Sequence, residues 1–288
     1  MLRSLSSAIS GLQSFQQRLD VIGNNNATDN TTAFKGARVG LADAFSQTLR
    51  SSSAGTGGSS GTSAMQIGLG VTVQSINNIY TQGAFTRTNV GTDLALTSNG
   101  FFVVRDPIST IQYVTRAGDF ILDETGNLVT AAGMRVQGYN DSGLTTMGDI
   151  TIDTTGMPAT SNPLATLVSF AIDTEGKINV NLSDGTQFVR GQILLQNFSN
   201  PQGLMKEGGN LYSGIGAAGP LGGAASPTPA AAGTNGLGRM QAGALELSNV
   251  DLATEFTNLI TTQRAYQANA RIITTSDEML QELVNLKR

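Results

Sequence analysis

The sequence has no cysteine, no histidine and no tryptophan among its 288 residues. These absences exclude disulfide bonds, thiolate and imidazole metal sites, cysteine nucleophiles and histidine general bases. Catalysis by a pair of carboxylates that meet in space is the enzymatic alternative that remains. We therefore expect no catalytic residues, no metal and no cofactor.

Charged residues are also scarce, at 13% of the chain, where a typical soluble domain has about 25%. The net charge of −4 provides no field that would attract nucleic acid or an anionic membrane. No run of 18 apolar residues is present, and the N-terminus lacks the continuous apolar stretch of a cleaved secretory signal. The sequence thus predicts no nucleic-acid partner, no membrane insertion and no cleaved signal peptide.

The two ends of the chain carry apolar residues in steps of three and four, which is typical of one stripe along a helix. At the N-terminal end the stripe consists of Leu2, Leu5, Ile9, Leu12, Phe15, Leu19 and Ile22. At the C-terminal end it consists of Leu252, Phe256, Leu259, Tyr266, Ala270, Ile273, Leu280 and Val284. These patterns predict helices over about 2–28 and 250–286, the second following a start signal in Ser248, Asn249 and Asp251. The stripes could pack on each other within one molecule or on neighbouring molecules.

The middle of the chain instead shows short segments of period two, such as INVNL and ILLQNF, separated by turn residues. The segments DETGNL and DTEGKI read as hairpin turns in which Gly126 and Gly176 supply a positive φ, and Asp184-Gly185 reads as another. The carboxylates of these turns lack the regular spacing of a calcium loop. A mainly antiparallel β domain is therefore predicted.

Two low-complexity stretches, 51–64 and 216–238, are rich in Gly, Ser, Ala or Pro and read as tethers. The predicted fold class is α+β, with long N- and C-terminal helices forming a paired, coiled-coil-like core and a central β domain. The predicted domains are a terminal helical core (1–30 with 247–288), an extended Ser/Gly-rich tether (31–65), the β domain (66–215 with 236–246) and a Gly/Ala/Pro linker (216–235).

An asparagine-rich run, LDVIGNNNATDNTTAFKG, occupies residues 19–36. Asparagine satisfies backbone groups locally and tolerates left-handed φ, so one interpretation is a helix end followed by a turn. The run contains more amides than one cap needs, and uncharged amides can pair across subunits without repulsion. A role in packing or assembly is the alternative.

Several segments resemble the rod and hook family of bacterial flagellar axial proteins, in the family's order. They include SLSSAISGLQSFQQRLDVIGNN, NTTAFKG, MQIGLGV, YTQGAFTRTNVGTDLALTSNGFFVV, VTRAGDFILDETGNLVT, FSNPQGL and the C-terminal LELSNVDLATEFTNLITTQRAYQANARIITTSDEMLQELVNLKR. The resemblance implies a helical tubular polymer with the terminal helices inside and the β domain outside. It also implies export of the unfolded subunit by the flagellar type III apparatus.

Both ends resemble the hook protein more than the distal rod protein. Yet hook proteins usually carry a further outer β domain after the segment VQGY, and here only about 25 residues separate Tyr139 from the next strand near Leu167. We expect a hook subunit, with a distal rod subunit as the alternative. The chain departs from the family's usual asparagine motif at Asn26, Thr28 and Asp29, and at Ala33, where glycine is common.

The resemblance and the helical stripes together predict an assembly interface. It comprises Leu5, Ile9, Leu12, Leu19, Ile22, Asn24, Asn25, Asn30, Thr31, Phe34, Leu252, Phe256, Leu259, Tyr266, Ile273 and Leu280. The implied partners are further copies of the chain, neighbouring axial and junction proteins, the export apparatus and the cap, and the implied location is the flagellar basal body or hook. A secreted β-domain adhesin is the alternative from another class; it would be a stable monomer that binds a ligand.

Overall fold

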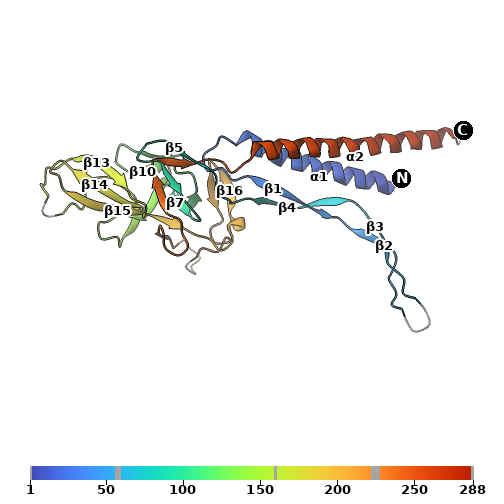
Figure 1. The fold of residues 1–288 in the computed structure, drawn as a ribbon, viewed down its shortest axis with the longest axis horizontal. Coiled ribbons are helices and arrows are strands. Elements are labelled where there is room, and N and C mark those ends of the chain that lie inside the picture. The colour runs from blue at the N-terminus through green and yellow to red at the C-terminus, as the bar shows by residue number, and fades with distance from the viewer. Residues whose placement is uncertain (1, 56–59, 159–160, 222–227, 287–288) are drawn as a thin grey trace. The chain divides into compact units, whose positions relative to one another are not determined.

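The computed structural model describes residues 2–55, 60–158, 161–221 and 228–286 (Figure 1). The chain forms two compact units, described here one at a time. The helical unit comprises Met1–Thr28, Gly36–Ile79 and Val250–Arg288. The β unit comprises Asp29–Lys35 and Tyr80–Asn249.

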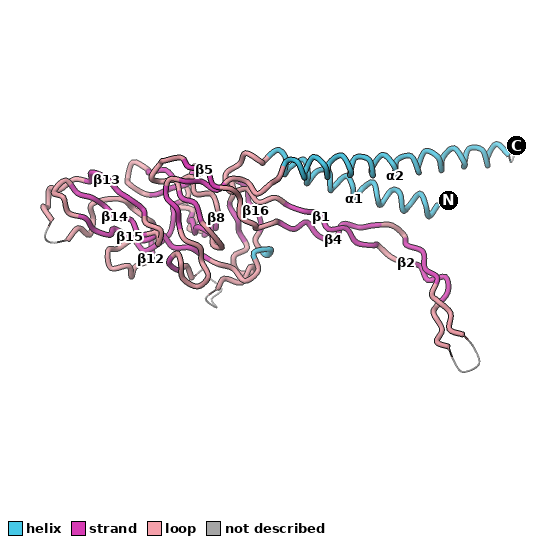
Figure 2. The backbone as a smooth tube through the Cα atoms, in the orientation of Figure 1, coloured by secondary structure: helices cyan, strands magenta, loops and turns pink. Residues whose placement is uncertain are grey.

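The helical unit contains both helices of the described chain, α1 (Leu2–Ala27) and α2 (Leu252–Leu286), shown in cyan in Figure 2. Asp251 caps α2, because its carboxylate accepts hydrogen bonds from the Ala253 N–H at 3.0 Å and the Thr254 hydroxyl at 2.7 Å. The two terminal helices expected from the apolar stripes are confirmed to within two residues at each end.

A two-stranded antiparallel ribbon completes the helical unit. Strand β1 (Ala37–Asp43) pairs with β4 (Val71–Asn78), and β2 (Ser46–Arg50) pairs with β3 (Met65–Gly68). Beyond β2 and β3, Ser53 and Thr62 form a further bridge. The α1 helix packs against this ribbon, where Ser14 Oγ donates to the Val71 carbonyl at 3.4 Å.

This ribbon differs from the predicted tether over 31–65. Residues 37–50 contain β-branched and apolar residues at alternating positions, and their partners at 65–78 lie across a loop too Ser/Gly-rich to signal pairing. The part of the predicted tether at 56–59 lies outside the described residues. The described remainder of 51–64 leads into and out of a hairpin end.

The β unit is built from antiparallel strands throughout its described residues. One sheet follows the order β13-β14-β15-β11-β7-β8-β17-β16, with β9, β10, β12 and β18 paired at its sides, and two small sheets join β19 to β6 and β20 to β5. The strands are β5 (Phe85–Arg87), β6 (Leu94–Leu96), β7 (Phe101–Arg105), β8 (Gln112–Thr115), β9 (Phe120–Leu122), β10 (Leu128–Thr130), β11 (Arg135–Tyr139), β12 (Met147–Asp149), β13 (Leu167–Ile172), β14 (Lys177–Leu182), β15 (Gln187–Gln196), β16 (Met205–Gly208), β17 (Leu211–Ser213), β18 (Ala230–Ala231), β19 (Met240–Ala242) and β20 (Ala244–Glu246). A short 3₁₀ helix covers Pro201–Gly203.

The three predicted hairpin turns are confirmed. Gly126, Gly176 and Gly185 have φ values of 80°, 80° and 83°, a region that favours glycine. They connect β9 to β10, β13 to β14 and β14 to β15. The expected α+β class with mainly antiparallel strands is therefore confirmed.

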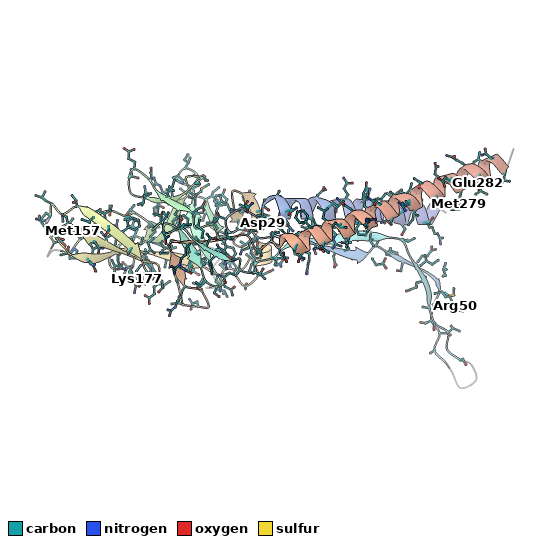
Figure 3. All side chains as sticks on the ribbon, turned by 45° about the horizontal axis from the view of Figure 1, so that its top comes forward. Asp29, Arg50, Met157, Lys177, Met279 and Glu282 are labelled. Carbon is teal, nitrogen blue, oxygen red and sulfur yellow. The ribbon has the colours of Figure 1, made fainter. Side chains whose placement is uncertain are left out.

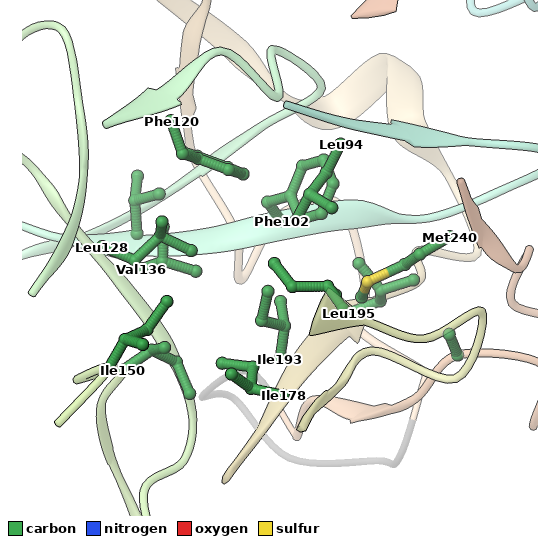
Figure 4. Packing of buried hydrophobic residues seen from close by; sticks show 14 of the residues in the cluster. Leu94, Phe102, Phe120, Leu128, Val136, Ile150, Ile178, Ile193, Leu195 and Met240 are labelled. Atoms are coloured by element: carbon green, nitrogen blue, oxygen red, sulfur yellow. The ribbon is translucent and has the colours of Figure 1, made fainter. Parts of the chain in front are cut away.

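The main core of the β unit lies between the strands shown in Figure 4. Phe102 and Phe120 meet edge to face there, with ring centroids 5.1 Å apart. A second cluster gathers Phe101, Phe198, Leu204 and Tyr212 with neighbouring apolar residues. The two clusters give the β unit an apolar interior of its own.

The boundaries of the β unit also differ from the sequence prediction. The predicted linker over 216–235 packs onto the unit in its described part, since Ala218 is fully buried and β18 pairs with β15. Small residues can signal a linker or close packing, and the sequence alone does not separate the two. Residues 29–35 and 247–249, predicted to lie outside the β domain, belong to the β unit.

Candidate assembly surface

The two helices lie side by side and run antiparallel, with their free ends together (Figure 1). Their contacts involve small and polar side chains. Asn25 Nδ2 on α1 donates to Glu255 on α2 at 3.4 Å, and a Cβ atom on Gly11 would lie 2.8 Å from Asn269 Nδ2. Glu255 and Asn269 are two steps of seven residues apart, with Thr262 between them. The seam within one molecule therefore includes polar side chains from both helices.

The predicted interface residues on the helices divide into three groups by exposure. Ile22 is buried. Leu5, Leu12, Leu19, Leu259 and Ile273 are half-buried, whereas Ile9, Leu252, Phe256, Tyr266 and Leu280 are exposed. The fold thus brings only part of the predicted apolar set into the interior.

The α2 helix leaves a long series of apolar side chains in solvent, which we call the α2 apolar surface. It consists of Leu252, Phe256, Ile260, Tyr266, Ile272, Met279, Leu280, Leu283, Val284 and Leu286. Phe256 is 49% exposed and Leu286 is 83% exposed. The last turns, where Figure 3 labels Met279 and Glu282, are exposed at every described position from 277 onward. Contiguous exposed apolar patches often mark interaction sites, and these residues are candidates for contact with another molecule.

The asparagine-rich run divides between the two units. Asn25 is buried, and its side chain makes two hydrogen bonds to Ala37 at the start of β1, one to the carbonyl at 2.8 Å and one from the N–H at 3.0 Å. The Asn24 carbonyl accepts bonds from Thr28 at the end of α1. Asn25 thus anchors the ribbon to α1 within one molecule, which is a packing contact and not the helix cap of the local interpretation.

Of the other predicted residues of this run, Asn30, Thr31 and Phe34 lie in the β unit. Asn24 in the helical unit and Asn30 in the β unit have exposed side chains, and Thr31 is half-buried. Phe34 is buried, with the Lys206 ammonium 4.3 Å from its ring centroid. Phe34 therefore packs inside the β unit.

The structure also brings together three buried charges that sequence reasoning did not select. Lys35 Nζ donates to Glu246 Oε1 at 2.6 Å, and Arg116 Nη1 donates to Glu246 Oε2 at 3.1 Å. Lys35 is fully buried and the other two are nearly so. Lysine is among the residues that are almost never fully buried unless paired, but sequence alone does not show burial.

Burial governs the protonation of this cluster. Loss of water lowers the pKa of Lys35, although the hydrogen bond to Glu246 acts in the opposite direction. Burial by itself raises the pKa of Glu246, but the Arg116 charge and the hydrogen bond from Lys35 outweigh it and hold that pKa below its usual value. Glu246 is therefore a carboxylate at neutral pH.

Across the described residues no helix is both long and apolar enough to cross a bilayer. Nor do the described Asp and Glu side chains gather in a group of three that could hold a metal ion. The expectation that the chain lacks a cofactor and catalytic activity stays a prediction.

The chain matches two family models. Residues 241–286 match "Flagellar basal body rod FlgEFG protein C-terminal", and residues 95–180 match "Flagellar hook protein FlgE/F/G D1 domain". The first match covers all of α2 and the second covers about half of the β unit. Both descriptions span hook and rod proteins, so similarity in these regions does not separate the two.

Full-length relatives carry the comparison further. The flagellar basal-body rod protein FlgG of Bacillus subtilis is 43% identical over 288 residues, covering 100% of both chains. FlgG of Agrobacterium fabrum is 34% identical over 281 residues, covering 96% of this chain and 97% of the relative. The flagellar hook protein FlgE of Borreliella burgdorferi is 28% identical over an alignment of 449 residues that covers both chains fully. With a relative this similar along its whole length, the chain belongs to the family of flagellar hook and basal-body rod proteins.

Proposed function

We propose that this chain is a distal rod subunit, which polymerises into the helical axial structure of the bacterial flagellum. The main support for this proposal is the full-length similarity to a basal-body rod protein, at 43% identity. The sequence favours the hook over the rod, and the comparisons favour the rod. The hook relative needs an alignment of 449 residues, whereas the rod relative aligns over 288.

The α2 apolar surface supports the proposed mode of assembly. Within one subunit the pairing of α1 and α2 uses Gly11, Asn25 and Asn269, and it leaves Phe256 and Leu280 uncovered. Burying one such side chain fully contributes about 1.5–3 kcal/mol. In the proposed polymer the helices of neighbouring subunits cover this surface, and it forms the main contact of the inner core.

Coiled-coil-like packing is part of this proposal. Glu255, Thr262, Asn269 and Ser276 recur every seven residues on α2, the repeat that keeps one seam facing a partner in a left-handed supercoil. Thr262 and Ser276 are the buried residues among the described positions of α2. The small polar seam would set the register within a subunit, and the apolar residues would join subunits.

A contact that does not close on itself produces a filament. Here the apolar residues of α2 have no equivalent surface on α1, whose described exposed large apolar residue is Ile9. The head-to-tail mode is part of the proposal and rests on the similarity to a basal-body rod protein. The proposal also includes export of the chain through the flagellar apparatus. Its further partners are junction proteins and the cap.

Electron microscopy of basal bodies from cells that lack this gene tests the proposal. We expect truncated rods, with full rods restored by the intact gene. Complete rods without a hook would assign the chain to the hook instead. Intact flagella, together with a stable monomer that binds a surface ligand, would contradict an axial role and favour the adhesin.

A further inference from the structure

The polypeptide passes between the two units at four points, after Thr28, Lys35, Ile79 and Asn249. On the side of the β unit, three of these passages are hydrogen-bonded to one another. The Ala33 N–H donates to the Glu246 carbonyl at 2.8 Å, and the Asn249 N–H donates to the Phe34 carbonyl at 3.3 Å. Segments 33–35 and 246–249 are thus held together, although about 210 residues separate them in sequence.

The third passage joins the same group. Lys35 Nζ donates to the Thr81 carbonyl at 2.8 Å, and Asn249 Nδ2 donates to the same carbonyl at 3.1 Å. The Gly83 N–H donates to Glu246 Oε1 at 2.9 Å. Residues 81–83, directly after the passage at Ile79, therefore share their partners with the other two segments.

Glu246 is the centre of this arrangement. Its carboxylate accepts hydrogen bonds from Lys35, Gly83 and Arg116, each on a different segment. Arg116 also donates from Nη2 to the Ser98 carbonyl at 2.7 Å, which ties the cluster to the main part of the β unit. Removing one partner from a buried charge cluster leaves an uncompensated charge in a dry site.

Close backbone packing also holds these segments together. A Cβ atom on Gly83 would lie 2.1 Å from the Leu247 carbonyl oxygen, so only glycine permits this approach. Lys206 Nζ donates to the Lys35 carbonyl at 2.7 Å, and Asn210 Nδ2 donates to the Thr32 carbonyl at 2.8 Å. Segment 32–35 is therefore hydrogen-bonded both to segment 246–249 and to Lys206 and Asn210.

Four of the segments by which the sequence resembles the flagellar family meet here. NTTAFKG supplies Lys35, YTQGAFTR supplies Gly83, VTRAGDF supplies Arg116 and LELSNV supplies Glu246. The assembly function assigned to the α2 apolar surface does not account for these residues, because they are buried in the β unit.

We infer that Lys35, Arg116 and Glu246 form a joint that fixes the chain passages to the β unit, so that twisting force entering through these segments reaches the sheet without local opening. We call it the Glu246 joint. The inference rests on the proposed axial function, because that function places the subunit under a twisting load. These are positioning residues, and the rival explanation is that the cluster merely stabilises the β unit as a whole.

The joint and the rival explanation predict faster hydrogen exchange at different backbone amides when the cluster is changed. Glu246→Gln removes the charge that Lys35 and Arg116 share, at nearly constant shape. Asp149→Asn is the matched control, because the Asp149 carboxylate also accepts bonds from two arginines, Arg105 and Arg135, but lies on β12 away from the passages. Hydrogen exchange of the full chain then compares amides at 33, 83 and 249 with amides of the sheet core.

We expect Glu246→Gln to speed exchange at Ala33, Gly83 and Asn249 at least 100-fold more than at core amides such as Val103, whose exchange should change only with the global stability of the β unit. Asp149→Asn should leave those three amides unchanged. Equal acceleration everywhere in Glu246→Gln, or no acceleration, would overturn the joint. If Glu246→Gln does not fold, the double variant Lys35→Met with Glu246→Gln, which keeps the net charge of the cluster, is judged by the same criteria.

A swimming assay tests the mechanical role of the joint separately from the proposed rod function. Cells carrying the joint variant should assemble polymer of normal length but swim at less than half the normal speed in viscous medium, whereas Asp149→Asn cells should swim normally. Normal swimming by the joint variant would overturn the mechanical role. Failure of the gene deletion to shorten the rod would instead overturn the proposed function, with the exchange result still standing.

Discussion

The side-chain amide of Asn269 on α2 lies against Gly11 on α1, with Nδ2 only 2.8 Å from the position of a Cβ atom on that glycine. Glycine inside a helix costs about 1 kcal/mol relative to alanine, so its presence in α1 needs a packing reason. The contact supplies that reason, because it lets the polar side chain of one helix approach the backbone of the other.

The first prediction concerns this contact. Gly11→Leu should force the helices apart, lower the melting temperature of the helical signal and reduce polymer yield in sedimentation. Gly11→Ala combined with Asn269→Ala should be at least as stable as the natural chain, because alanine favours the helix and the smaller partner makes room. A Gly11→Leu chain that melts and assembles normally would contradict the proposed seam.

The helices and the hairpins could be predicted from sequence because their signals are local. Apolar steps of three and four located α1 and α2, and Asp-Gly together with the paired Gly126 and Gly176 turns located hairpins. The ribbon of β1 with β4 could not be predicted, because its strands pair across a long Ser/Gly-rich loop. Register between distant strands depends on which face is buried, and a half-exposed ribbon gives a weak pattern.

The candidate site was predictable only in part, for a related reason. Apolar periodicity identifies which residues of a helix share a face, but not whether that face meets the same molecule or another one. Phe256 is therefore correctly placed on a stripe and yet remains exposed. The Glu246 joint had no local signal, since its charges come from positions 35, 116 and 246 and meet only in the folded chain.

The second prediction concerns Ala33, where glycine is common in the family. Ala33 is buried with φ of 54°, a left-handed conformation that costs a non-glycine residue about 1–2 kcal/mol. Ala33→Gly should remove this strain, partly offset by about 0.4–1 kcal/mol of added freedom in the unfolded chain. We expect a higher urea midpoint for the β unit. Ala33→Val should lower that midpoint, and a gain with valine would show that the backbone here is unstrained.

The third prediction concerns the α2 apolar surface. Phe256→Asp should abolish assembly, because a carboxylate would be buried without a partner between subunits. Phe256→Leu is the control, which keeps an apolar side chain and should assemble at a higher critical concentration. Because Phe256 is half-exposed in one subunit, the monomer should keep its melting temperature in both variants. Normal polymers from Phe256→Asp would remove this residue from the interface.

The fourth prediction concerns acid stability. Burial raises the pKa of Glu246, Asp149 and Asp153, but hydrogen bonds and cationic partners outweigh burial and leave each pKa below its ordinary value. A carboxyl with a lowered folded-state pKa stabilises the fold above its unfolded pKa, and this contribution is lost as pH falls through the folded value. The β unit should therefore lose stability progressively below the ordinary pKa of 4.5 for Glu and 3.8 for Asp.

Urea unfolding between pH 7 and pH 2 measures this loss. Glu246→Gln should be less stable at neutral pH and should show a shallower decline in acid, because one of the titrating groups is gone. A variant whose decline is as steep as that of the natural chain would show that Glu246 has no lowered pKa in the folded state. Asp149→Asn provides the corresponding comparison for the β12 cluster.

The fifth prediction concerns the ribbon of β2 and β3, whose strands expose Leu49, Met65 and Ile67 and beyond which Ser53 and Thr62 form a bridge. We expect this ribbon to contact neighbouring subunits in the proposed tube and to set whether the tube stays stiff or bends. Replacing 54–61 with Asn-Gly closes the ribbon directly between the bridged residues Ser53 and Thr62 by a two-residue turn, without disturbing β1 and β4. Assembly should persist, because the α2 apolar surface is untouched, while bending stiffness measured from the curvature of isolated tubes should fall.

A matched variant replaces 54–61 with eight Gly and Ser residues. It keeps the length of the segment, and it should keep the stiffness if the length of the segment is what matters. Unchanged curvature and stiffness in the shortened variant would show that the ribbon end has no part in the mechanics, and the stiffness would then have to arise from the helical core alone.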